Sequence, residues 1–334
     1  MAIITDKKQV LDIYAEARQK GWVMPCFCSE NLTTTEAVLA AAKEYADEKG
    51  IKDVPVIIAI TCQYDHRTQA SYYTHTRRWD TGLKLFVSDL KILACEGGPY
   101  ESLRVMIHLD HIQFDTDSEL LSWNMEDFSS IMFDASRLPF EKNIRLTSEF
   151  VRERGHLILV EGACDEIVDA SGTEKSELTT PEKAEEYFHK TEVDLIVANL
   201  GTEHRASAKD LKYYGEFARK IKDRIGTRIV LHGASSVPAD QIEALMDDGV
   251  CKVNIWTALE RDSSPALLEA MTVNASRVGG RDMAKKLLLD EMLGVKAITD
   301  EKASLSYFTT EARQEIIFNE MKKIAGGYYR LWYR

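Results

Sequence analysis

The chain has 334 residues, of which 45% are hydrophobic and 29% are charged, a composition typical of a folded globular protein. Its formal net charge of -12 argues against nucleic acid and anionic membrane surfaces as partners. No apolar run approaches the roughly 18 residues that a membrane-spanning helix needs, and the N-terminus lacks the apolar core of a secretory signal. The six cysteines form no CxxC pair, which indicates reduced thiols. We therefore expect a cytoplasmic protein.

Short apolar runs rich in Val and Ile recur along the chain, and a helical pattern follows most of them. Such runs are typical of buried parallel strands. We expect strands over residues 23–28, 54–61, 103–110, 130–134, 157–162, 195–200, 228–232 and 251–255. We expect helices over residues 7–20, 34–48, 140–154, 181–190, 208–224, 238–247 and 265–269. This alternation predicts an α/β fold, a (β/α)8 TIM barrel with an N-terminal helix, in a single domain over residues 1–334. A doubly wound open sheet is the alternative, but no GxGxxG motif follows the first strand to support it.

Two segments exceed a minimal barrel. Residues 62–102 form a long insertion after strand 2 that is rich in Tyr, His and Arg, with a helix expected over 83–95. Its side chains either line a sugar pocket or pack on the barrel rim. Residues 281–334 are expected to form a C-terminal helical extension with an aromatic tail over 328–333. Such a tail packs either on its own barrel or on a partner subunit, and we expect contacts here in a homo-oligomer, a dimer or a tetramer.

Polar residues gather at the predicted ends of strands 3 to 8. Barrel enzymes place their chemistry at the C-terminal ends of the strands, so these side chains are expected to converge on one rim. The chain has only eight histidines, which makes several at successive strand ends notable. The residues concerned are His108, Asp110, His111, Asp134, Glu161, His204, His232 and Asn254.

Three of these histidines predict a catalytic zinc site. Three protein ligands that leave one open position define such a site, and imidazoles from three strands can meet above a barrel. We assign His111, His204 and His232 as ligands. Asp134 and Glu161 are the candidates for a second metal position.

The segment after strand 3 also holds the expected acid–base group. Asp110 precedes a predicted ligand, so its carboxylate would lie against a metal-bound substrate. His108 lies three residues before His111. In a regular strand the two imidazoles therefore cannot point to the same side.

The loops after strands 7 and 8 predict a phosphate site. Gly233, Ser235 and Ser236 precede a helix expected from Pro238, and Thr257 follows strand 8. Loops at these positions, with free amides at helix N-termini, are the usual phosphate site of barrel enzymes. The alternative is that the two serines only cap a helix.

Taken together, these residues resemble the class II, zinc-dependent ketose-bisphosphate aldolases, the fructose/tagatose-bisphosphate aldolase family. The resemblance covers roughly residues 8–262. The matching blocks are residues 108–111 (HLDH), 131–136 (IMFDAS), 138–144 (LPFEKNI), 160–161 (VE), 179–182 (TTPE), 199–204 (NLGTEH), 231–236 (LHGASS) and 252–257 (KVNIWT). Their order and spacing make the signal specific.

The resemblance implies a mechanism. In the family, zinc polarises the ketose carbonyl and stabilises the enediolate left after carbon–carbon cleavage. Asp110 matches the aspartate that moves the proton of the hydroxyl on the cleaved bond. Gly233, Ser235, Asn254 and Thr257 match the positions that hold the dihydroxyacetone phosphate end. A monovalent cation is a further candidate cofactor.

The chain also departs from the family pattern around strand 5. The second of two glutamates usual there is replaced by Ala163, and the glycine-rich acidic stretch of the following loop is absent. That loop normally carries the acid that exchanges the proton on the enediolate carbon. The candidates for this role are Asp165, Glu166, Asp169 and Glu174.

Other departures lie on the pocket wall. Arg205 follows the second expected ligand where the family has glycine, and Trp256 replaces a small or acidic residue. Arg205 would either bind an anionic group of the substrate or pair with a rim acid such as Glu203. The pattern favours an aldolase for a non-standard ketose phosphate or a sugar-acid derivative. The alternatives are another zinc-dependent sugar-phosphate enzyme, such as an epimerase or a hydrolase, and a non-catalytic aldolase-like subunit.

Overall fold

A computed structural model of the chain describes residues 3–167, 178–202 and 212–334. Eight parallel strands pair in chain order and close into a barrel, so the predicted fold class is confirmed. The strands are β1 (Met24–Cys28), β2 (Pro55–Thr61), β3 (Arg104–Gln113), β4 (Ser130–Asp134), β5 (Leu159–Ala163), β6 (Leu195–Val197), β7 (Ile229–Leu231) and β8 (Val250–Ile255). Nearly every strand residue is buried, as continuous apolar runs predict.

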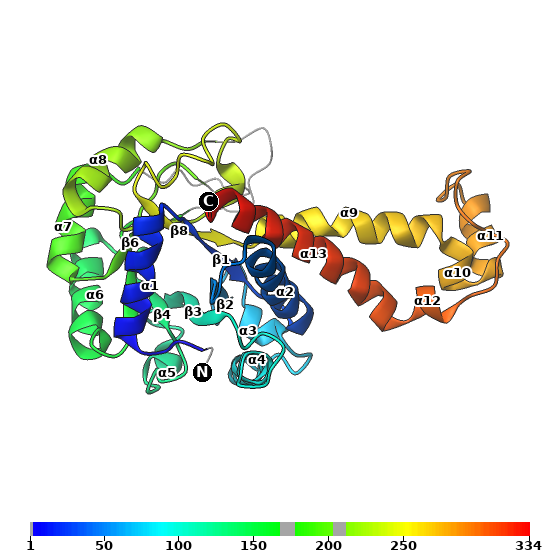
Figure 1. The fold of residues 1–334 in the computed structure, drawn as a ribbon, viewed down its shortest axis with the longest axis horizontal. Helices are drawn as coiled ribbons and strands as arrows, with labels where there is room; N and C mark the ends of the chain where they lie inside the picture. The colour runs from blue at the N-terminus through cyan, green and yellow to red at the C-terminus, as the bar shows by residue number, and fades with distance from the viewer. Residues whose placement is uncertain (1–2, 168–177, 203–211) are drawn as a thin grey trace.

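Helices surround the barrel (Figure 1). The principal ones are α1 (Lys7–Lys20), α2 (Leu32–Lys49), α6 (Phe140–Arg154), α7 (Pro181–Thr191) and α8 (Gly215–Ile225). Side chains at their starts set several boundaries, since Asp6, Asn31 and Thr180 each accept a hydrogen bond from a first-turn amide. The insertion after β2 contains α3 (Gln69–Tyr72) and α4 (Trp79–Leu93), and α5 (Ser118–Leu121) follows β3.

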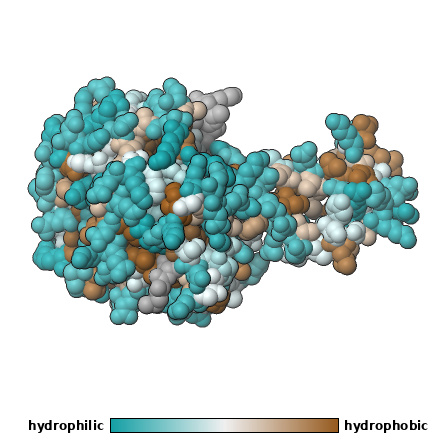
Figure 2. All heavy atoms as spheres, viewed as in Figure 1, coloured by the Kyte–Doolittle hydropathy of each residue, from teal (hydrophilic) through white to brown (hydrophobic). Residues whose placement is uncertain are grey.

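A helical arm projects from one side of the barrel (Figure 1). The long helices α9 (Thr257–Val273) and α13 (Thr310–Trp332) run side by side, and α10 (Ala275–Gly279), α11 (Arg281–Leu289) and α12 (Leu305–Phe308) lie toward its far end. Hydrophobic side chains gather at this end on the face seen in Figure 2. At the end of α11 and just beyond it, Leu289, Met292 and Val295 are largely exposed.

The aromatic tail packs on its own barrel. The Tyr333 ring stacks on Trp22 with 4.4 Å between centroids, and its hydroxyl donates to the Pro55 carbonyl at 3.0 Å. The Trp332 indole donates to the Ile242 carbonyl at 3.0 Å. Trp22 and Pro55 lie at the starts of β1 and β2, so the tail covers the end of the barrel opposite the strand C-termini. Trp332 and Tyr333 are buried in this packing.

The helix expected over residues 238–247 does not form. A short 3₁₀ turn, η1 (Ala234–Ser236), follows β7, and successive turns then lead to β8. The backbone amides of Gln241 and Ile242 both donate to the Pro238 carbonyl, as in a first helical turn, but no further turn of helix follows. Within the described ranges, no helix is both long and apolar enough to span a membrane.

Candidate active site

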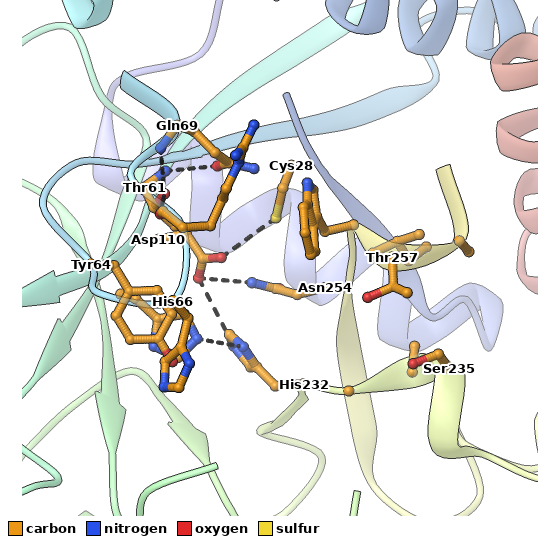
Figure 3. A pocket seen from close by; sticks show the side chains of 17 residues that line it. Cys28, Thr61, Tyr64, His66, Gln69, Asp110, His232, Ser235, Asn254 and Thr257 are labelled. Carbon is orange, nitrogen blue, oxygen red and sulfur yellow. Dashed lines mark hydrogen bonds and ion pairs between the residues drawn. The ribbon is translucent and has the colours of Figure 1, made fainter. Parts of the chain in front are cut away.

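A pocket with about 670 Å³ of empty space lies at the C-terminal ends of the strands. It is lined by seven residues that were assigned to the site from the sequence, and by Trp256, and all of them come from the ends of β3, β7 and β8 and the loops beyond them (Figure 3). The seven assigned residues are Asp110, His111, His232, Gly233, Ser235, Asn254 and Thr257. The structure therefore brings them to one cavity at the end of the barrel that the fold predicts.

A bulge in β3 directs two adjacent residues into this pocket. Leu109 pairs with Ile131 and Ile112 pairs with Phe133, so Asp110 and His111 together oppose a single residue of β4. His111 takes up the extra residue with a φ of 48°, in the left-handed region that non-glycine residues rarely adopt. Consecutive residues of a regular strand point to opposite faces, whereas here both line the same pocket. The expectation that His108 and His111 point to different sides applies to a regular strand, and β3 is not regular between Leu109 and Ile112.

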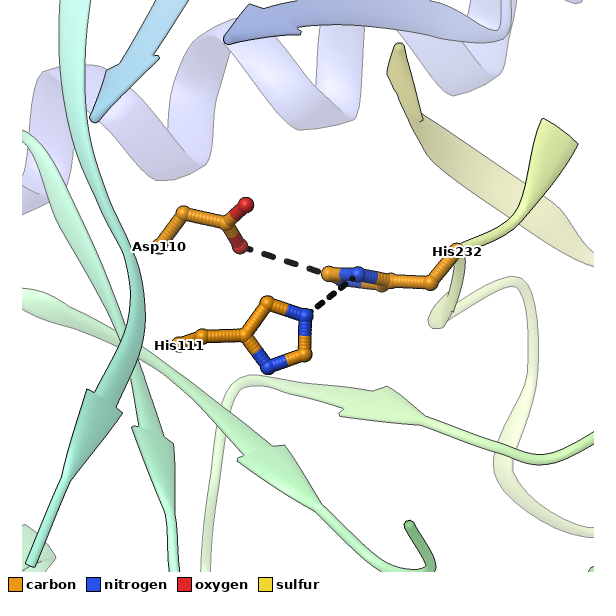
Figure 4. Close-up of side chains that lie close together, drawn as sticks. All are labelled: Asp110, His111 and His232. Atoms are coloured by element: carbon orange, nitrogen blue, oxygen red, sulfur yellow. Dashed lines mark hydrogen bonds and ion pairs between the residues drawn. The ribbon is translucent and has the colours of Figure 1, made fainter. Parts of the chain in front are cut away.

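Asp110, His111 and His232 form a compact group of potential metal ligands (Figure 4). One ligand atom from each lies within 4.8 Å of the others, and His111 Nε2 lies 3.0 Å from His232 Nδ1. His111 Nδ1 lies 2.9 Å from the Asp134 carboxylate. A carboxylate that accepts a hydrogen bond from Nδ1–H fixes the tautomer in which Nε2 carries the lone pair that binds a metal. This arrangement is typical of zinc-bound histidines. This donor set fits zinc. His204, the third ligand expected, lies outside the described residues.

The charges in this group favour an ionised aspartate. Burial alone would raise the pKa of Asp110, but the neighbouring His111, His108 and His232 outweigh it and hold that pKa well below its usual range. Burial alone would lower the pKa of His111, but Asp110 and Asp134 outweigh it and raise that pKa. Asp110 is therefore ionised and can accept hydrogen bonds.

Two neighbours orient the Asp110 carboxylate (Figure 3). The Asn254 amide donates to Oδ1 at 2.9 Å, and the Cys28 thiol lies 3.5 Å from Oδ2. Burial raises the pKa of Cys28 well above its usual value, so the thiol remains protonated and acts as a donor. The oxygen of the same side-chain amide, Asn254 Oδ1, is buried and has no hydrogen-bond partner among the described residues.

A buried ion pair forms the floor beneath the pocket. Lys252 Nζ lies 2.8 and 2.9 Å from the two oxygens of Glu161 and 3.0 Å from His108 Nε2. His108 Nδ1 contacts Ser130 Oγ at 2.8 Å, so both its ring nitrogens are occupied by protein groups. The two acids expected at a second metal position therefore already have partners. Glu161 forms an ion pair with Lys252, and the Asp134 carboxylate contacts His111 Nδ1.

The expected phosphate end of the pocket is built from the segments after β7 and β8. Gly233 adopts a φ of 65°, which a residue without a side chain tolerates, and it leads into η1, where Ser235 lies. Thr257 is the first residue of α9, a 17-residue helix whose N-terminus borders the pocket. The free amides at that N-terminus favour an anion. The second helix N-terminus expected near this site is absent, because residues 238–247 form turns.

Two of the four acids expected in the loop after β5, Asp165 and Glu166, lie among the described residues. Asp165 pairs with Lys183 and accepts from Thr179 at 2.7 Å, while Glu166 lies 3.4 Å from Arg137 Nε. Asp169, Glu174 and Arg205 lie outside the described residues.

Several pocket residues were not assigned from the sequence. The Tyr64 ring stacks on His111 with 4.2 Å between centroids and an interplanar angle of 1°. Arg67, from the same loop after β2, and Gln69, the first residue of α3, also line the pocket. The aromatic and basic content of the insertion was the available signal, but it did not distinguish pocket lining from rim packing.

The fructose-bisphosphate aldolase class II family model matches residues 8–317. The chain belongs to this family. Two similar curated relatives are fructose-bisphosphate aldolases, one from Staphylococcus epidermidis, 27% identical over 81% of this chain and 87% of the relative, and one from Geobacillus stearothermophilus, 28% identical over 83% and 92%. Membership of the family supports aldolase activity.

Solved structures show the same fold. A fructose-bisphosphate aldolase from Campylobacter jejuni superposes with a TM-score of 0.77 and 19% identity, over 99% of this chain and 95% of that one. The YdjI aldolase from Escherichia coli K12 gives a TM-score of 0.63 and 21% identity, over 96% and 94%.

Proposed function

We propose that the protein is a zinc-dependent aldolase that reversibly cleaves a phosphorylated ketose into dihydroxyacetone phosphate and an aldehyde. The observation that carries the proposal is the convergence of Asp110, His111 and His232 in one pocket, next to the N-terminus of α9. His111 and His232 would hold the metal, with His204 as the third ligand. When bound, zinc supplies a Lewis acid that polarises the ketose carbonyl.

The chain's own residues would perform the remaining tasks. Asp110 would take the proton of the hydroxyl on the cleaved bond, since it is ionised and oriented by Asn254. Asn254 Oδ1, buried and without a partner in the described residues, would accept from a substrate hydroxyl. Gly233, Ser235 and Thr257 would hold the phosphate at the start of α9.

Two measurements on the purified protein test this proposal. Metal analysis should find one zinc ion per chain. Incubation of the zinc-loaded protein with phosphorylated ketoses, including fructose and tagatose 1,6-bisphosphate, should release triose phosphate in a coupled assay. Zinc without cleavage of any ketose phosphate would favour another zinc-dependent sugar-phosphate enzyme, such as an epimerase. A folded protein that binds no zinc would favour a non-catalytic subunit.

Three further expectations accompany this proposal. We propose that the chain works as one aldolase-like domain in the cytoplasm, and that it forms a homo-oligomer. A monovalent cation is a candidate cofactor. The residue that protonates the dihydroxyacetone phosphate carbon would come from the loop after β5, where Asp165 and Glu166 already hold Lys183 and Arg137.

A further inference from the structure

One wall of the pocket has no task in the reaction described above. It is formed by Arg67, from the loop after β2, and Trp256, which follows β8. Glu30, from the segment after β1, holds both of them. Arg67 Nε lies 3.0 and 3.1 Å from the two Glu30 oxygens, and Nη2 also donates to Oε2. The Trp256 indole N–H donates to Glu30 Oε1 at 2.7 Å. Only 7% of the Glu30 side chain is exposed, so this residue is an anchor rather than a ligand-binding group.

The loop that carries Arg67 is fixed to the end of β2. The Thr61 amide donates to Gln69 Oε1 at 2.9 Å, and the Gln69 amide donates back to Thr61 Oγ1 at 3.1 Å. The Thr61 hydroxyl donates to the Arg67 carbonyl. Backbone contacts of this kind hold a side chain in place before a ligand arrives, which reduces the entropy lost on binding.

Arg67 retains hydrogen-bond donors for a ligand. A guanidinium has five N–H groups in a planar fork, and Glu30 engages Nε and Nη2. Within the described part of the chain, no hydrogen bond involves Nη1. The Arg67 side chain is 37% exposed and lines the pocket, so a ligand there can reach these donors.

The charge of this wall is already compensated. Arg67 forms an ion pair with Glu30, and a second acid, Glu260, lies close by. Glu30 offsets the charge of Arg67, and Glu260, whose pKa burial and Glu30 raise to about 7, adds no positive charge. Such a wall attracts a second phosphate weakly. It suits hydroxyl oxygens, which accept from Arg67, and the C–H groups of a sugar chain, which pack on the flat indole of Trp256.

We propose that Arg67 and Trp256, anchored by Glu30, bind the aldehyde half of the substrate as an uncharged, hydroxylated carbon chain. The preferred substrate is then a ketose with a single phosphate, at the dihydroxyacetone phosphate end, rather than a bisphosphate. This inference rests on the proposed aldolase function and names the substrate class for the same pocket.

The test is condensation of dihydroxyacetone phosphate with different aldehydes by the zinc-loaded protein. We expect kcat/KM to be at least about tenfold higher for glyceraldehyde than for glyceraldehyde 3-phosphate. Arg67→Met and Arg67→Lys should each lower kcat/KM for glyceraldehyde about tenfold, mainly through KM, because neither side chain offers the fork. The loss should be much smaller for acetaldehyde, which has no hydroxyl for Arg67 to bind.

The matched control is Arg77→Met. Arg77 stacks on the same Tyr72 ring as Arg67, at 4.2 Å against 4.6 Å, but it does not line the pocket. This variant should retain wild-type aldehyde selectivity. A wild-type preference for glyceraldehyde 3-phosphate would overturn the inference, as would Arg67 variants that lose glyceraldehyde and acetaldehyde activity equally.

A separate measurement distinguishes failure of the inference from failure of the proposed function. An aldolase exchanges a carbon-bound proton of dihydroxyacetone phosphate with deuterium from solvent when no aldehyde is present, and NMR detects this exchange. Exchange by the wild-type protein combined with a preference for the phosphorylated aldehyde would reject the inference alone. Absence of exchange would reject the proposed aldolase function and the inference with it.

Discussion

Lys252 and Glu161 form a fully buried ion pair beneath the candidate active site, with Nζ within 2.9 Å of both carboxylate oxygens. Lys252 comes from β8 and Glu161 from β5, so the pair joins two strands that are not neighbours in the barrel. Burial alone would lower the pKa of Lys252, but the acidic groups around it, Glu161 among them, outweigh this effect and raise that pKa. The lysine therefore remains charged. The pair connects the barrel interior to the site through His108, which accepts from Lys252 at 3.0 Å.

Lys252→Met should destabilise the protein strongly, because it leaves the buried Glu161 carboxylate with only His108 Nε2 beside it, at 3.6 Å. Removal of one member of a buried ion pair costs about 3–5 kcal/mol of unfolding free energy. Denaturant unfolding measures this loss. The double variant Lys252→Met/Glu161→Gln should recover part of it, because the remaining side chain is uncharged. If the double variant were as unstable as the single one, lost packing rather than charge would explain the effect.

Asp110→Ala should retain zinc and lose turnover. A positioned acid–base group contributes about 10²–10⁴-fold to a rate, so a loss in kcat of that size is expected in ketose phosphate cleavage. Metal analysis of the same preparation provides the second readout. Asp115→Ala, which removes an exposed carboxylate beyond the end of β3, is the control and should behave like the wild type. Loss of zinc from Asp110→Ala would instead identify Asp110 as a metal ligand.

His232→Ala should reduce zinc affinity more than Asp134→Asn does. Substitution of an outer-shell partner such as Asp134, which holds His111 Nδ1 at 2.9 Å, typically weakens metal binding about 10–100-fold. Loss of a direct ligand should exceed that range. Zinc titration against a competing chelator gives both affinities, with the exposed His156→Ala as control. Unchanged zinc affinity in His232→Ala would contradict its assignment as a ligand.

Glu260→Gln should alter how stability depends on pH. Burial and Glu30 raise the pKa of Glu260 from 4.5 to about 7 in the folded state. Between these two values the unfolded chain loses the proton while the folded chain keeps it, so wild-type stability falls as pH rises through this window. One pKa unit corresponds to about 1.4 kcal/mol, and partial solvent access reduces the effect, so we expect about 1–2 kcal/mol.

Thermal unfolding at several pH values from 4 to 8 measures this difference. The Tm of Glu260→Gln relative to wild type should increase between pH 4.5 and 7 and remain constant above pH 7. A difference that does not vary with pH would mean that Glu260 titrates normally in the folded protein.

Local patterns were sufficient to predict the barrel. A buried parallel strand needs a continuous apolar run, and such runs mark all eight strands, as at residues 130–134, where predicted and observed bounds coincide. Helix α6 was likewise predicted at its observed bounds, residues 140–154. The strand-end rule then indicated where Asp110, His111, His232 and Asn254 would converge, because it depends on strand direction alone.

Features that depend on contacts between distant segments could not be predicted in the same way. The Arg67–Glu30–Trp256 arrangement joins the segments after β2, β1 and β8, and no spacing in the sequence reveals it. The helix expected from Pro238 had an acceptable local pattern, yet the chain turns repeatedly before β8. Lys252 gave a weak signal as a charged residue within an apolar run, but its partner Glu161 lies 91 residues away.

The bulge in β3 also constrains how this protein can vary. Asp110 and His111 share the pocket because β3 has one residue more than β4 between Leu109 and Ile112. Deletion of a single residue there would restore a regular strand and turn one of the two side chains out of the pocket. Point substitutions on the pocket wall leave this spacing intact. Insertions and deletions should therefore be tolerated in exposed loops away from the pocket far more readily than in these four residues.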